Sequence, residues 1–251
     1  MKILSLNAWH GTQESELRDF LTAQLSSTDV FCFQEADGSS IERTFKDIFP
    51  EIYFQEISAK KISGRESYCL RTFVRQGIEV VGHDALLGES GGDSGYCLIT
   101  HLREDGTDFY VANVHGAPYP GDKLDTDGRI QQSRVILQYL DERDGPKIIC
   151  GDFNLQPHTE SIALFRRAGF ADLISDYDIA TTRNELAWRK YPDNKQLFAD
   201  YAFVSQDVLL HDFRVPNNRA SDHLPLLIEL DAAVALVPKT AVLAGLPATQ
   251  R

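Results

Sequence analysis

Six short apolar runs in this chain of 251 residues each adjoin polar residues at one end. The clearest run is 148–150, Ile-Ile-Cys, which leads directly into Gly151-Asp152-Phe153-Asn154. Because residues two apart on an extended chain share a face, the Asp152 carboxylate and the Asn154 amide are predicted to point the same way. A turn rich in Gly, Asp and Asn after a strand also has a purely structural explanation. The fold and the chemistry therefore depend on whether the pattern recurs.

The same pattern recurs at five further places. Asn7 follows the run 2–6, Gln34-Glu35 follow 30–33, His115 follows 109–114, Asp200 follows 197–199, and Asp222-His223 precede 224–228. If these residues form one site, both halves of the chain must fold together. We therefore expect one domain over residues 1–231. The remaining tail, 232–251, is either an appended packing segment or a loose end.

The residue types in this set suit hydrolysis of a phosphate ester, which needs a metal ion, a group that activates water and donors for the developing charge. Glu35 and Asp222 offer hard carboxylate oxygens to a metal. Asp152 is the leading candidate for the group that activates water, and Asn154 would donate to a phosphate oxygen. A single Glu at a strand end, or a lone His before a strand, is by itself more often structural.

Two parts of the set depend on local geometry. Asp222 and His223 are neighbours that would point to opposite sides of an extended chain, so a bend is expected there if both face one site. Asp200 would then fix the tautomer of His223. Asn7 has two readings: its amide holds Glu35 and the surroundings of the metal, or it simply caps the first strand.

This ordered set resembles the endonuclease/exonuclease/phosphatase superfamily, the metal-dependent phosphoesterases that include DNase I-like nucleases, abasic-site endonucleases, neutral sphingomyelinases and inositol-polyphosphate 5-phosphatases. The resemblance spans residues 1 to about 231. It implies an α+β fold, a four-layer α/β/β/α sandwich of two packed, mainly antiparallel sheets, with Mg²⁺ or Mn²⁺ as cofactor. Gln34-Glu35 match the family's metal-binding pair, and Asp200 and His223 match its Asp–His pair. Together with the chemistry above, the roles are metal binding for Asn7, Glu35 and Asp222, and catalysis for His115, Asp152, Asn154, Asp200 and His223.

His115 bears on the choice within the family. The resemblance places it where DNase I-like nucleases, sphingomyelinases and 5-phosphatases also carry His, whereas abasic-site endonucleases carry Tyr. An abasic-site repair role is therefore disfavoured. Gly116 departs from the Leu common after this His, and the loop 117–121, Ala-Pro-Tyr-Pro-Gly, matches no subfamily. The substrate class stays open.

Periodicity predicts helices and strands in alternation. Apolar stripes predict three helices, at Leu17, Phe20, Leu21 and Leu25, at Ile41, Phe45 and Ile48, and at Ile130, Ser133, Leu137 and Leu140. The strand runs 96–102 and 109–115 flank an Asp-Gly turn and predict a hairpin. Antiparallel pairs with helices between them favour two sheets packed face to face, each covered by helices on its outer face.

Charge and cysteine usage narrow the functional classes. With 25 basic and 37 acidic residues the net charge is −12, which argues against tracking along nucleic acid but does not exclude a nuclease. The four cysteines lack metal-finger spacing and are expected to be free thiols. The sequence shows no charged leader before an apolar stretch and no apolar run of ~20 residues, so we expect a cytoplasmic protein without a membrane span.

Basic residues that suit a phosphate are few, namely Lys123, Arg129, Arg183, Arg189 and Lys190. The segment 183–191 either supplies Arg183 as a substrate-binding residue and Trp188 as a stacking surface, or is a solvated loop with a partly buried Trp. Within it, Trp-Arg-Lys-Tyr at 188–191 spells the name of a plant DNA-binding family but lacks that family's zinc ligands. The calcium-loop-like run 125–128 lacks the required Glu, and a helix is expected to open at Arg129 instead.

The expected function is therefore a Mg²⁺-dependent hydrolase acting on phosphate ester bonds. A nuclease or phosphodiesterase on short or single-stranded nucleic acid is the first candidate. A small-molecule or lipid phosphoesterase, sphingomyelinase- or inositol-phosphatase-like, is the alternative, and the acidic composition and the lack of long basic runs favour it. A non-catalytic phosphate-binding module is the third candidate, but the intact polar set argues against it.

Overall fold

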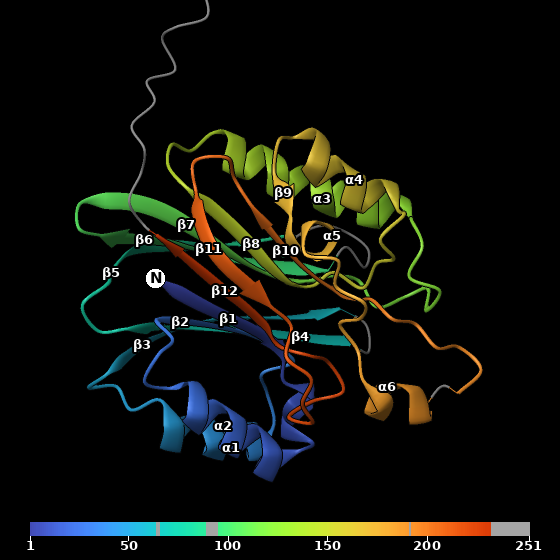
Figure 1. Cartoon of the computed structure of the whole chain (residues 1–251), viewed down its shortest axis with the longest axis horizontal. Coiled ribbons are helices and arrows are strands. Elements are labelled where there is room, and N and C mark those ends of the chain that lie inside the picture. The colour runs from blue at the N-terminus through green and yellow to red at the C-terminus, as the bar shows by residue number, and fades with distance from the viewer. Residues whose placement is uncertain (64–65, 89–94, 191, 232–251) are drawn as a thin grey trace, which may run out of the picture.

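Two six-stranded sheets are stacked face to face and covered on their outer faces by helices (Figure 1). The computed structural model describes residues 1–63, 66–88, 95–190 and 192–231. The predicted four-layer α/β/β/α sandwich is confirmed. The tail 232–251 and Tyr191 lie outside the described residues.

Both sheets have the same arrangement of strands. The first has the order β11 (Leu209–Arg214), β12 (Leu226–Asp231), β1 (Lys2–Asn7), β2 (Val30–Gln34), β4 (Glu66–Arg75), β3 (Phe54–Ser63). The second has the order β5 (Glu79–Leu86), β6 (Tyr96–Glu104), β7 (Thr107–His115), β8 (Lys147–Asp152), β10 (Asp200–Val204), β9 (Ala171–Asp172). Among the described residues, only the central pairs β1–β2 and β7–β8 are parallel, so the sheets are mainly antiparallel as predicted.

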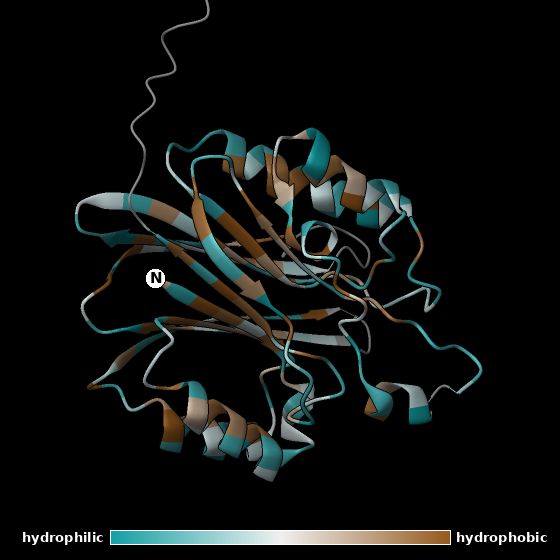
Figure 2. Ribbon diagram, in the orientation of Figure 1, coloured by the Kyte–Doolittle hydropathy of each residue, from teal (hydrophilic) through white to brown (hydrophobic). Residues whose placement is uncertain are grey.

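Helices α1 (Glu14–Gln24) and α2 (Ser39–Ile48) cover the first sheet, and α3 (Asp127–Asp141) and α4 (Glu160–Arg167) cover the second (Figure 1). Shorter elements are η1 (Trp9–Gly11), α5 (Leu173–Asp176) and α6 (Glu185–Lys190). Figure 2 shows hydrophobic residues along the strands and hydrophilic residues over the loops and the outer surfaces of the helices. Within the described ranges, no helix is long and apolar enough to cross a bilayer.

The predicted stripes of α1 and α2 are largely confirmed, because Leu17 and Leu21 of α1 and Ile41, Phe45 and Ile48 of α2 are buried. These side chains join the outward-facing residues of β1 and β2 in one apolar cluster. Alternation along a strand then sends the other residues of β1 and β2 into the space between the sheets. The four cysteines are buried free thiols, as predicted.

The predicted stripe of α3 is partly wrong. Ile130 and Leu137 are only half-buried, and the buried face consists of Arg129, Gln132, Ser133, Ile136 and Leu140. The first turn of α3 packs on the loop that precedes it, where the Arg129 guanidinium donates to backbone carbonyls. A polar residue with such partners is as well buried as an apolar one, so hydrophobicity alone misplaced the inner face by about one residue.

The hairpin of β6 and β7 is confirmed, and Asp105 and Gly106 turn the chain with φ of 49° and 78°. Positive φ at both central residues is the geometry of a type I′ turn. The strand predicted at 197–199 is wrong. There β10 begins only at Asp200, which pairs with Asp152 across an antiparallel ladder, so the apolar residues that form the strand follow this acid rather than precede it.

Candidate active site

The two parallel strand pairs bring their carboxyl ends to one edge of the sandwich. Asn7 ends β1 and His115 ends β7, while Asp152 ends β8 and Glu35 directly follows β2. The register places Asn7 opposite Gln34 in one sheet and His115 opposite Asp152 in the other. Because parallel strands end at the same edge, four of the predicted site residues meet although 145 positions separate Asn7 from Asp152.

Asn7 links the two sheets at this edge. Its Nδ2 donates to Glu35 Oε1 and to Asp152 Oδ2, both at 3.0 Å, and its Oδ1 accepts from the Trp9 backbone N–H at 3.0 Å. The nitrogen of the Asn7 amide therefore faces the two carboxylates, and the oxygen is used by the backbone. Asn7 positions Glu35 and Asp152 rather than presenting its own oxygen to them.

The residues at this edge fit a divalent cation. His115 Nε2 lies 3.9 Å from both Glu35 Oε1 and Asp152 Oδ2, and the ligand atoms of these three residues all lie within 4.8 Å of one another. The buried Nδ1 of His115 has no hydrogen-bond partner among the residues that the structure describes. Two carboxylates with one imidazole form a donor set for a divalent ion, and carboxylate oxygens suit Mg²⁺ and Mn²⁺. A second group shares Asp152 and adds Asp200 and His223.

His223 is held from behind by Asp200. Its Nδ1 lies 2.9 Å from both oxygens of Asp200, and its Nε2 lies 3.7 Å from Asp152 Oδ2. The predicted bend is present, because the chain bends at Ser221-Asp222 immediately before His223. Asp222 Oδ1 lies 3.9 Å from His223 Nε2, but Asp222 belongs to neither candidate metal group.

Asn154 and Gly116 close the site from the side of β7. The Asn154 backbone N–H donates to Asp152 Oδ1 at 2.9 Å, and its Nδ2 donates to the Gly116 carbonyl at 3.0 Å. The Gly116 N–H donates to the Asp152 carbonyl at 2.6 Å. A Cβ at position 116 would lie 2.1 Å from the Phe153 carbonyl oxygen, so this close approach excludes the Leu found elsewhere in the family.

A family model described as Endonuclease/Exonuclease/phosphatase family matches residues 4–223. The chain belongs to this family. The match covers the whole polar set from Asn7 to His223. The protein is therefore a phosphoesterase of this family, and it has a buried cluster of His and Asp side chains. No curated protein matches the chain in sequence.

Solved structures of the family share the fold. An endonuclease/exonuclease/phosphatase from Bacteroides vulgatus has a TM-score of 0.72 at 18% identity, covering 92% of this chain and 98% of its own. A Bacteroides thetaiotaomicron mannosyl-6-phosphatase has a TM-score of 0.71 at 17% identity, covering 92% and 99%. D. rerio TDP2 complexed with single-strand DNA product has a TM-score of 0.68 at 15% identity, covering 92% and 98%.

Basic side chains near Asp152 keep its carboxyl group ionised. Burial favours the neutral acid, but the nearby basic groups, His223 and Lys123 foremost, outweigh it, and the pKa of Asp152 lies below its usual range. At neutral pH Asp152 is therefore a carboxylate, which is the form that binds a cation or accepts a proton from water.

The pKa values of His223 and Asp200 are raised, in contrast to that of Asp152. Burial and the nearby Arg183 disfavour the charged imidazole, yet Asp200 and Asp152 favour it more, and the pKa of His223 is raised. Burial also raises the pKa of Asp200. The pair therefore keeps a proton at higher pH than an isolated histidine would.

Three residues at or near Glu35, namely His10, Asp37 and Lys60, are absent from the predicted set. His10 Nε2 lies 3.4 Å from Glu35 Oε2, and His10 Nδ1 lies 2.8 Å from Asp37 Oδ1. Lys60 Nζ adds an ion pair to Asp37 at 2.9 Å. The available signal was spacing, because Asp37 is two residues beyond Glu35 and His10 is three beyond Asn7.

The backbone is unusual at this site. Eight non-glycine residues in the described part of the chain have positive φ, and five of them gather here, namely Trp9, His10, Glu35, Lys123 and Asn154. Such conformations cost about 1 kcal/mol or more each and persist where the surroundings impose them. Their concentration at this edge supports its choice as the candidate active site.

The basic residues predicted as phosphate contacts differ in their partners and surroundings. Arg183 donates to Asp222 Oδ2 at 3.0 Å, so its charge is partly neutralised beside the site. Residues 185–190 form helix α6 rather than a solvated loop. Trp188 donates to the Gln196 carbonyl at 2.9 Å, and Lys195 Nζ covers its ring at 4.0 Å, which removes that face from stacking on a base.

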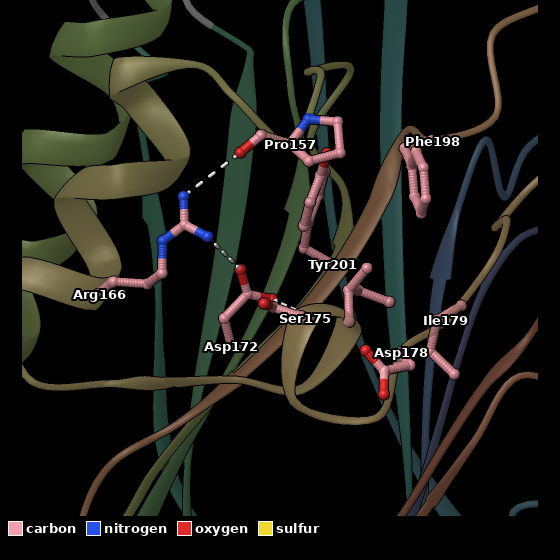
Figure 3. Close-up of a pocket in the computed structure, with 9 residues that line it drawn as sticks. Pro157, Arg166, Asp172, Ser175, Asp178, Ile179, Phe198 and Tyr201 are labelled. Atoms are coloured by element: carbon pink, nitrogen blue, oxygen red, sulfur yellow. Dashed lines mark hydrogen bonds and ion pairs between the residues drawn. The ribbon is translucent and has the colours of Figure 1, made fainter.

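A separate cavity of about 310 Å³ lies beside α4, α5 and the start of β10 (Figure 3). Arg166 reaches Asp172 at 3.3 Å and the Pro157 carbonyl at 3.3 Å, and Asp172 accepts from the Ser175 backbone N–H. These polar groups satisfy one another. The candidate catalytic side chains lie at the strand ends and not in this cavity.

Proposed function

We propose that this phosphoesterase depends on a divalent cation and hydrolyses phosphodiester bonds in short or single-stranded nucleic acid, or at the end of a chain. The observation that carries the metal dependence is the meeting of Glu35, His115 and Asp152 within 4.8 Å. Glu35, His115 and Asp152 would hold the ion, which supplies Lewis-acid polarisation of the phosphate.

The chain's own residues supply the remaining chemistry. Asp152 is ionised and buried, so it orients a water molecule or accepts its proton. His223 carries a proton at Nε2, 3.7 Å from Asp152 Oδ2, where it stabilises negative charge that develops on the phosphate. Asp200 keeps His223 in this orientation through Nδ1.

The choice of substrate follows from the small number of basic side chains that are available to bind phosphate. The net charge is −12, and Arg183 is already paired with Asp222. A long duplex held by many phosphate contacts does not fit this surface. TDP2, whose fold the chain shares, is complexed with single-strand DNA product, which supports a single strand or chain end.

A small-molecule or lipid phosphate ester is the second candidate. The acidic composition favours it, as does the shared fold with a mannosyl-6-phosphatase. The two candidates separate in a panel assay with Mg²⁺ or Mn²⁺ on single-stranded DNA, RNA, bis-p-nitrophenyl phosphate, a sugar phosphate, phosphoinositides and sphingomyelin. Turnover of none of them, by a protein that still binds inorganic phosphate, would leave the non-catalytic phosphate-binding module.

Glu35→Gln tests the metal. We expect this substitution, or excess EDTA, to reduce turnover by at least about 100-fold, because a neutral amide is a poor ligand for a divalent cation. Glu16→Gln on the exposed surface of α1 removes the same charge and serves as the control. Full activity of Glu35→Gln, or of the wild type in chelator, would rule out the proposed metal.

A further inference from the structure

The loop between β7 and α3 is held from inside by a buried guanidinium. Arg129 is fully buried, and its Nε and Nη2 donate to the Ala117 carbonyl at 3.2 and 3.0 Å. Nη2 also donates to the Pro120 carbonyl at 2.8 Å, and Nη1 donates to the Leu124 carbonyl at 2.5 Å. Arg129 was a predicted phosphate contact, and that prediction is wrong, because its donors are occupied by the loop.

The loop is also tied to its neighbours on the outside. Asp125 accepts from the backbone N–H groups of Glu160 and Ser161, at 2.6 and 3.0 Å, at the start of α4. The Gln156 N–H donates to the Lys123 carbonyl at 2.9 Å. These contacts fix the backbone at Lys123 and two residues beyond it. The anchored loop therefore fixes the position of the Lys123 backbone.

Lys123 is the residue that this scaffold places inside the site. Its φ is 59°, only 8% of it is exposed, and its Nζ donates to Asn154 Oδ1. Lysine is rarely buried to this extent without a paired acid. No carboxylate in the described part of the chain forms an ion pair with Nζ. Burial lowers the pKa of Lys123, whereas the nearby Asp152 and Asp200 favour its charged form.

A buried ammonium has three donors, and the neutral amide oxygen of Asn154 does not compensate its charge. The Lys123 ammonium therefore lies near Asp152 and is already placed to bind an anion. A phosphate oxygen would complete its hydrogen bonds and neutralise its charge, which is a charge-assisted contact of the strong class. The cost of burying the charge in the free protein is then offset when the substrate binds.

We propose that Lys123 binds a non-bridging oxygen of the scissile phosphate, with Asn154 as the residue that positions its ammonium. This inference rests on the proposed function, since it needs a phosphate at the centre formed by Glu35 and Asp152. It assigns Lys123 a direct contact with the substrate, whereas Arg129 and Asp125 act only by holding the loop.

The test is Lys123→Met, which keeps the length of the side chain and removes its charge. We expect the dissociation constant for inorganic phosphate, measured by calorimetry with Mg²⁺ present, to rise about 10- to 100-fold, and kcat/KM for bis-p-nitrophenyl phosphate to fall by a similar factor. The urea midpoint should stay the same or rise, because a desolvated charge is removed. Lys46→Met, on the exposed face of α2, makes the same chemical change away from the site and should behave as wild type.

Two outcomes would overturn the role of Lys123. Phosphate binding by Lys123→Met within about threefold of wild type would show that no phosphate contact is lost. Weakened binding together with a lowered urea midpoint would assign Lys123 to the stability of the fold instead. Failure of the proposed function looks different: the wild type would then bind phosphate through Lys123 but turn over no ester, with or without metal.

Discussion

At the residue scale, the contact between His223 and Asp200 is the most constrained part of the site. Both side chains are almost fully buried, and both Asp200 oxygens lie 2.9 Å from His223 Nδ1. Removing one partner leaves the other as a buried polar group without its counterpart. The sequence predicted that Asp200 would hold His223 and that the chain would bend before His223, and the structure shows both. It did not predict that β10 begins at Asp200.

We expect His223 and Asp200 to act as a unit in turnover. His223→Ala should lower kcat by about 100- to 10,000-fold, the usual contribution of a positioned acid or base. Asp200→Ala should lower it by a similar order, since the imidazole then loses its orientation. The double variant should resemble the worse single variant. The measurement is log kcat for the three variants on one substrate, and strictly additive losses would show that the two residues act independently.

At the element scale, the sequence pattern predicted the buried stripes of α1 and α2 and misjudged the inner face of α3. The stripes of α1 and α2 are apolar because they face strands. The inner face of α3 begins with Arg129, whose partners are loop carbonyls contributed by residues 5 to 12 positions away in sequence. No periodicity of hydrophobic residues reports such partners, so the anchored loop and the buried Lys123 became visible only in the structure.

Asp125 gives the anchored loop a testable pH dependence. Burial opposes ionisation of Asp125, but hydrogen bonds from Ser161 and Glu160 outweigh it, and its pKa is lowered. A lowered folded-state pKa means that the stabilisation is fully present above the unfolded pKa of about 3.9 and is lost as the pH falls through the folded pKa. Asp125→Asn should therefore lower the free energy of unfolding by about 1 kcal/mol at pH 7.

The same difference should shrink below pH of about 4, where the wild-type carboxyl becomes neutral as well. Urea unfolding of wild type and Asp125→Asn at a series of pH values measures it. Asp19→Asn is a matched control, because Asp19 lies exposed on α1, away from the loop. A difference that stays constant down to pH of about 2 would mean that charge is not the origin of the effect.

At the scale of the whole molecule, each sheet contributes one parallel strand pair, and the site exists only where the two pairs end together. This is why the polar residues, and the pairs Asn7–Glu35 and Asp200–His223, could be identified from the sequence, whereas the contact of Asn7 with Asp152 could not. The strand ends are local features, but the contact between Asn7 and Asp152 spans the stacked sheets. The partners of the basic residues were equally hidden, since Arg183 is neutralised by an acid 39 positions later.

The overall charge sets the last expectation, which concerns salt. A chain of net charge −12 gains little from counterion release along extended nucleic acid. Of the basic residues near the site, Arg129 is occupied by the loop and Arg183 is paired with Asp222, which leaves Lys123 as the main phosphate contact. We therefore expect KM for a short single-stranded oligomer to depend weakly on salt, with a slope of log KM against log salt of about 1 to 2.

The measurement compares this slope for a short oligomer and for a long duplex, at fixed Mg²⁺ and pH. The duplex should bind no more tightly than the oligomer, because an acidic surface offers its additional phosphates no partners. Each neutralised duplex phosphate contributes about 0.9 to the slope. Tight duplex binding with a slope of about 5 or more would imply roughly six phosphate contacts, and would mean that basic side chains outside the site described here reach along a duplex.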